Sequence, residues 1–276
     1  QSLYQVLALS QFQGVSLNLV RKFAGQLLKS LAFLRQSNVD VIHCDLKPEN
    51  VLLAEPSSQG QVKIIDFGSS CMTHKQLHKY IQSRWYRAPE VLMGIPYGQE
   101  VDIWSVACIL SELHTGRPLF PGGHEPLTKR SASHDMLCRF SKLLGELPQH
   151  MLEEAVEVAH QNKANKAAGK KDKRLTGVDM SDETFHWELS HLATHRSSKS
   201  ELAKVHGADT WGPRGKWARE RHHSSAHYDL FLDFMEKMLR FDPKRRALPS
   251  TLLKHPFLDD GVWHNLGTER PTETLL

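Results

Sequence analysis

The chain has 276 residues, of which 40% are hydrophobic and 24% charged, the composition of a globular protein long enough to bury a core. No run of 18 apolar residues occurs, which argues against a membrane protein, and the first ten residues lack the pattern of a signal peptide. The net charge is only +4. The four cysteines form no CxxC pair, and unpaired thiols in a domain of this size lead us to expect a reducing compartment, cytoplasmic or nuclear.

The first quarter of the chain predicts one helix followed by short strands. Between Leu17 and Leu34 the apolar residues fall on one wide stripe behind a suitable N-cap, Ser16, which predicts an amphipathic helix. Two short runs rich in branched residues, 40–44 and 49–54, predict strands on either side of a loop. The run "QVKIID" at 61–66 predicts a third strand after a turn.

The rest of the chain predicts helices around a polar insert. Residues 101–114 are apolar nearly all round, which is typical of a buried central helix. Residues 134–159 predict two helices broken near Pro148, and residues 227–241 predict a further amphipathic helix. Between them, residues 160–225 hold 13 basic and 8 acidic residues with weak periodicity, which indicates a basic insert. The pattern as a whole predicts a mainly helical α+β fold.

Polar side chains gather in two loops at the ends of the predicted strands. Asp45, Lys47 and Asn50 share the first loop, and Asp66 ends the next strand. Asn50 and Asp66 offer the oxygen ligands that Mg²⁺ prefers. Asp45 is then placed to accept a proton from a hydroxyl nucleophile, and Lys47 to offset charge on a phosphoryl group. Phosphoryl transfer depends mainly on positioning and electrostatics, so these groups suit that reaction.

Five ordered motifs resemble those of protein kinases. They are "HCDLKPEN" at 43–50, "DFG" at 66–68, "APE" at 88–90, "DIWS" at 102–105 and "DPKRR" at 242–246. The resemblance implies that Asp45 is the catalytic base, that Asn50 and Asp66 bind Mg²⁺ and ATP, and that Asp102 begins the buried central helix. It also implies that Arg246 pairs with Glu90.

Finer features are similar to the dual-specificity tyrosine-regulated kinases (DYRK) of the CMGC group. Cys44 replaces the usual arginine before the catalytic acid, and "YIQSRWYRAPE" carries Tyr80 ahead of Arg84 and Arg87. In that family such a tyrosine is phosphorylated by the kinase itself and pairs with the two arginines, since guanidinium groups bind phosphate well. The resemblance also implies that Ser83 braces the catalytic acid. Only the second tyrosine of the family's tyrosine-x-tyrosine pair is kept.

The resemblance covers the large lobe of a kinase. No glycine-rich flap and no strand lysine of the small lobe precede the catalytic loop. We therefore expect residues 1–258 to be the large lobe only, with 160–225 as an insert and 259–276 as a tail. The expected function is transfer of the ATP γ-phosphoryl group to protein Ser or Thr, in a fragment that is inactive by itself. The alternative is a catalytically inactive lobe that acts as a protein-interaction module.

Two other interpretations of the sequence, a histidine metal site and a nucleic-acid site, are less favoured by its patterns. The spacing of His74 with His78, and of His191 with His195, fits metal ligands on a helix, but neither pair has a third ligand in a convincing position. The lysines at 163–174 fit a solvated loop better than a nucleic-acid site, because no aromatic residue interleaves with them. We expect protein substrates and ATP as partners, and neither membrane nor nucleic acid.

Overall fold

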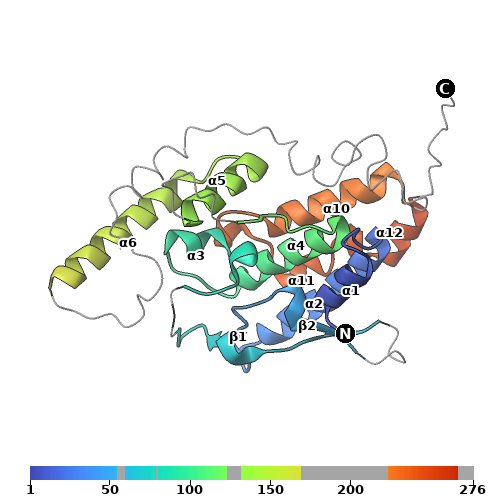
Figure 1. Ribbon diagram of the computed structural model, residues 1–276, viewed down its shortest axis with the longest axis horizontal. Coiled ribbons are helices and arrows are strands. Elements are labelled where there is room, and N and C mark those ends of the chain that lie inside the picture. Colours follow the sequence, from blue (N-terminus) through green and yellow to red (C-terminus); the bar gives the residue numbers. More distant parts are fainter. Residues whose placement is uncertain (55–59, 77, 79, 123–131, 169–222, 267–276) are drawn as a thin grey trace.

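The computed structural model describes residues 1–54, 60–76, 78, 80–122, 132–168 and 223–266 (Figure 1). Most of these residues form a helical body, with short strands along one edge. The helices are α1 (Leu3–Leu9), α2 (Leu17–Leu34), α3 (Pro89–Met93), α4 (Glu100–Thr115), α5 (Ala132–Leu144), α6 (Gln149–Ala167), α10 (Ser225–Met238), α11 (Pro249–Leu252) and α12 (Asp260–Asn265). The strands are β1 (Val41–Ile42), β2 (Val51–Leu53), β3 (Val62–Ile64) and β4 (Cys71–Met72).

Helix α4 lies at the centre of the body, with α2 and α10 packed against it and α11 packed on α2 (Figure 1). Every residue from Val101 to Thr115 is buried, which explains why the sequence there is apolar on all sides. Trp104 packs against the rings of Phe120 and Phe140. The expected central helix is confirmed, and it gives the site a rigid support.

Helix α2 follows its predicted bounds. Ser16 accepts a hydrogen bond from the Leu19 amide, so it caps the helix as its sequence position indicates. The buried stripe of α2 packs along α4, whereas Phe33 on the other side is exposed. The amphipathic pattern therefore reports directly which face of α2 meets the core.

The strands pair into two antiparallel ribbons of two strands each. In one, Val51 lies opposite Ile64, and in the other, Ile42 lies opposite Cys71. The loop between β1 and β2 and the loop after β3 therefore end at the same place, because β2 and β3 run side by side. Both loops were expected to carry the chemistry.

The helices after residue 130 agree with the sequence, and α5 and α6 are separate on either side of Pro148. Helix α6 continues to Ala167, so it enters the segment expected as an insert, and residues 169–222 lie outside the described residues. Part of the expected tail forms α12, whose Trp263 is buried against α2 and α10 residues. Over the described ranges, no helix is long and apolar enough to cross a bilayer.

Candidate active site

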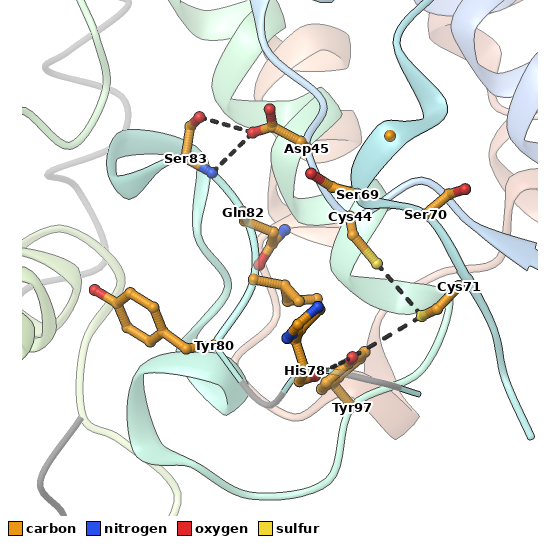
Figure 2. A pocket seen from close by; sticks show the side chains of 12 residues that line it. Cys44, Asp45, Ser69, Ser70, Cys71, His78, Tyr80, Gln82, Ser83 and Tyr97 are labelled. Atoms are coloured by element: carbon orange, nitrogen blue, oxygen red, sulfur yellow. Dashed lines mark hydrogen bonds between the residues drawn. The ribbon is translucent and has the colours of Figure 1, made fainter. Parts of the chain in front are cut away.

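Asp45 lies in the loop between β1 and β2 and is bound from two sides. The ammonium of Lys47 donates to Asp45 Oδ2 at 2.7 Å. On the other side, the Ser83 hydroxyl and amide donate to Asp45 Oδ1 at 2.7 and 3.1 Å (Figure 2). Lys47 Nζ also reaches Ser83 Oγ at 3.3 Å, so the three residues form a closed set. Asp45, Lys47 and Ser83, which were expected as the base, the phosphate-side cation and the brace, thus meet at one carboxylate.

The electrostatics of this set keep Asp45 ionised. Burial by itself raises the pKa of the carboxyl, but the hydrogen bonds from Lys47 and Ser83, with the charge of Lys47, lower it below the usual value. Asp45 is therefore an anion at neutral pH, with its lone pairs directed at fixed donors. A carboxylate in this state can orient a hydroxyl group and accept its proton.

Asn50 and Asp66 lie at neighbouring loop ends. The amide of Ile65 donates to Asn50 O at 2.9 Å, which extends the β2–β3 ladder by one step and places Asp66 next in the chain. The Asn50 side-chain amide nitrogen donates to Asp45 O at 2.9 Å, so its Oδ1 is directed elsewhere as an acceptor. Asp66 is exposed and left-handed, with φ of 64°. This pair of oxygen donors fits a hard divalent cation such as Mg²⁺.

The backbone beside Asp45 is fixed from below by α4. The amides of His43 and Cys44 donate to the two carboxylate oxygens of Asp102 at 2.7 and 3.1 Å. Burial raises the pKa of Asp102 to about 7, and these two hydrogen bonds oppose the shift. Cys44 has φ of 68°, so the loop turns sharply just before Asp45. Asp102 therefore holds a strained turn in place.

The comparison with known families agrees with this geometry. The family model described as the protein kinase domain matches residues 2–258, which is more than half of the chain. The chain belongs to the protein kinase domain family. Kinase domains transfer phosphate from ATP with Mg²⁺ to proteins, which supports the expected cofactors and substrates at this coarse level.

The same match does not support the expectation that the chain is the large lobe only. It spans nearly the whole chain, so it does not indicate that one lobe of the kinase domain is missing. Within the described ranges, the strands of this kinase domain form two ribbons of two strands each. The described fold is thus a kinase domain that contains both helices and strands, with helices in the majority.

The segment expected as the activation segment lies beside Asp45. The ring of Tyr80 lies under the Arg87 guanidinium, 3.7 Å from Cζ to the ring centroid, and Arg87 also donates to the Tyr80 hydroxyl. Arg87 is buried and bonds the carbonyls of Ile81 and Gln82 at 2.8 and 2.6 Å. Arg84 is exposed. The two arginines expected to act together thus have different surroundings.

A second ion pair lies beneath the segment. Arg246 donates from both terminal nitrogens to Glu90, at 2.7 and 2.9 Å, and both side chains are fully buried. Arg246 also bonds the carbonyls of Glu100 and Phe241. This pairing joins α3 to the chain that follows α10, and it anchors the end of the activation segment to the helical body.

Two features of the kinase domain were missed by the sequence analysis. Gln82 is buried and left-handed, and its side chain joins the activation segment to α4. Cys44 Sγ lies 3.6 Å from Cys71 Sγ, at the edge of a cavity of about 340 Å³ that also reaches Asp45 and Ser83 (Figure 2). The sequence "IQSRWY" around Gln82 is the only signal that could have indicated its role. Nothing in the sequence indicates that the thiols of Cys44 and Cys71 lie close together.

Of the two histidine pairs, only His74 with His78 lies within the described residues, and it belongs to no metal-ligand set there. His74 bonds Asp40 at 3.4 Å, and no group of three or more metal-binding side chains occurs among the residues that the structure describes. His191 and His195, like the lysines beyond position 168, lie outside those residues.

Proposed function

We propose that this kinase domain phosphorylates Ser or Thr in protein substrates. The observation that carries the proposal is the bracing of the Asp45 carboxylate by Lys47 and Ser83. A substrate hydroxyl bound at this carboxylate gives its proton to Asp45 as its oxygen forms a bond to the γ-phosphorus and the bond to ADP breaks. Lys47, at the same carboxylate, offsets negative charge on the transferred group.

Asn50 and Asp66 are the proposed ligands of Mg²⁺. When bound, the ion neutralises charge on the phosphate oxygens of ATP. The chain's own contribution is to hold the two ligands, because the Asn50 amide is fixed on Asp45 O and the β2–β3 ladder sets the position of Asp66. The backbone positions of both ligands therefore follow from the register of β2 and β3.

We also propose that the domain is of the DYRK type and phosphorylates its own Tyr80. The ring of Tyr80 already lies under Arg87, so a phosphate on its hydroxyl needs no large movement to meet a guanidinium. Arg84 is exposed and can supply the second fork. The phosphate thereby compensates for the absence of an arginine at position 44, which is Cys44 in this chain. The free thiols fit a further proposal, that the protein resides in the cytoplasm or nucleus.

We further propose that the described residues form the large lobe of a kinase. They carry the catalytic, metal-binding and anchoring motifs and only two ribbons of two strands each. A lobe of this kind lacks the flap and lysine that clamp ATP, so the chain by itself is expected to bind ATP weakly and to be inactive. Titration with Mg·ATP tests this directly. A tight, magnesium-dependent affinity for the chain alone contradicts it.

The catalytic proposal is tested in a protein that joins this chain to a kinase small lobe. We expect transfer from γ-labelled ATP to Ser or Thr of a mixed protein substrate, and mass spectrometry to find phosphate on Tyr80. Asp45→Asn should remove the transfer, while Tyr80→Phe should reduce it. If the joined protein and the Asp45→Asn variant are equally inactive although both fold and bind ATP, the chain acts instead as an interaction module.

A further inference from the structure

Gln82 is an unusual residue for its position in the activation segment. It is 7% exposed, and its φ of 69° lies in the left-handed region. A non-glycine residue there costs on the order of 1 kcal/mol, so the surroundings must hold it in place. A buried amide also requires hydrogen-bond partners on both of its atoms. The surroundings of Gln82 meet both requirements.

The side chain of Gln82 joins three parts of the chain. Its Nε2 donates to Val101 O at 3.0 Å and to Ser105 Oγ at 2.8 Å, both on α4, and lies 3.3 Å from Tyr86 O. Its Oε1 accepts from the Ala88 amide at 2.9 Å. The amide therefore fastens the segment from 82 to 88 onto the buried central helix.

The backbone of Gln82 meets the catalytic loop. Its amide donates to Cys44 O at 2.9 Å, and the next amide, of Ser83, donates to Asp45 Oδ1 at 3.1 Å. The left-handed turn directs these two consecutive N–H groups at two consecutive residues of the loop, and Figure 2 shows Ser83 facing Asp45 beside Gln82. A shift of Gln82 thus moves Ser83 away from the carboxylate.

We propose that Gln82 is a positioning residue for the catalytic base, which it fixes through Ser83. The role of Asp45 as base rests on the proposed function, but the placement of Ser83 by Gln82 does not. The side-chain amide holds Gln82 on α4, the held residue keeps the left-handed turn, and the turn aims Ser83 at Asp45. Asp102 fixes the other side of the same loop from the same helix.

A simpler account is that the left-handed backbone suffices and the amide adds only general stability. Glycine separates the two, because it adopts positive φ without strain but has no amide. If the amide positions Ser83, then Gln82→Gly loosens Ser83 although its backbone suits the turn. If the backbone suffices, Gln82→Gly leaves Ser83 as it is.

The test is residue-resolved amide hydrogen exchange on the full chain. We expect exchange of the Ser83 amide to rise about tenfold or more in Gln82→Gly and in Gln82→Glu, since each bond lost is worth roughly 1 kcal/mol. Ser105→Ala, which leaves Gln82 in place but removes an acceptor of its Nε2 and the hydroxyl that donates to Tyr86 O, should raise it about threefold. Amides in the middle of α4 report global opening and serve as the internal reference.

Gln26→Ala is the matched control. Gln26 also joins two segments through its amide, to Gly60 O and from the Val62 amide, and none of these bonds involves the 82–88 segment or α4. It should lower the melting temperature without changing Ser83 relative to the α4 amides. The proposal is overturned if Ser83 exchanges as in the wild type in Gln82→Gly, or if it changes equally in Gln26→Ala. Should both Gln82 variants fail to fold, Ser105→Ala decides by the same criterion, independently of any kinase activity.

Discussion

Arg246 and Glu90 lie 156 positions apart in the chain, yet they form a two-pronged ion pair with both side chains fully buried. Removing one partner leaves the other charged and out of water. We therefore expect Arg246→Met to lower the free energy of unfolding by about 3–5 kcal/mol. Chemical denaturation measures this change.

A double variant tests whether the cost comes from an unpaired buried charge, and a variant at an exposed ion pair serves as the control. The double variant Glu90→Gln with Arg246→Met should be more stable than the sum of the single changes predicts, because it leaves no buried charge unpaired. Lys237→Met removes an exposed pair with Asp233 and should cost no more than about 0.5 kcal/mol. Equal costs for the buried and exposed pairs would show that burial does not matter here.

Glu112 predicts an unusual pH dependence of stability. Burial raises its pKa to about 7, the hydrogen bond from Tyr86 opposes the shift, and the charge of Glu49 adds to it. The folded state then binds a proton that the unfolded state has already lost between about pH 4.5 and 7, so this group's contribution is present at low pH and is lost as the pH rises through 7. Between pH 5 and 8 we expect wild type to lose about 1–3 kcal/mol more than Glu112→Gln.

The comparison with Glu112→Gln isolates that one group. Glutamine keeps an acceptor for the Tyr86 hydroxyl but does not titrate. Glu153→Gln, at an exposed position, should leave the pH dependence of the wild type unchanged. Urea denaturation of the three proteins at pH 5 and pH 8 supplies the measurement, and parallel behaviour of wild type and Glu112→Gln would contradict a raised pKa.

The sequence predicts the parts of this fold in which one pattern dominates. Helix α4 is apolar on every side because every side is buried, and α2 has one wide stripe because that side packs against α4, α11 and the core around them. The order of the motifs indicated the kinase domain that the family match supports. The predicted strands indicated that the loops at their ends carry the polar residues of the site. They did not indicate which of those side chains are in contact.

What the sequence leaves open depends on contacts between distant segments. The approach of Cys44 to Cys71 follows from the β1–β4 register together with a left-handed turn, and neither is visible in a local pattern. The bonds of Gln82 to α4 require the fold to be known first. The different surroundings of Arg84 and Arg87 likewise arise from burial and not from their spacing.

Gly116 offers a prediction that only the structure could give. It ends α4 with φ of 78°, and a Cβ there would lie 1.9 Å from Phe12 O. Gly116→Ala therefore combines left-handed strain with a backbone clash, and we expect a loss above about 3 kcal/mol or failure to fold. Gly60 has nearly the same φ, 79°, with open space around it, so Gly60→Ala should cost only about 1 kcal/mol. Thermal unfolding compares the two, and similar losses would argue against the clash.

Arg84 and Arg87 differ in how much they contribute to the stability of the fold. Arg87 bonds the carbonyls of Ile81 and Gln82 with its fork and covers the ring of Tyr80, whereas Arg84 is exposed. Lysine keeps the charge but cannot make the forked bonds, so Arg87→Lys should destabilise the unphosphorylated protein by about 2 kcal/mol. Arg84→Lys should change it by less than about 0.5 kcal/mol. Denaturation of the two variants decides the matter, because equal effects would mean that the forked bonds of Arg87 do not stabilise the fold.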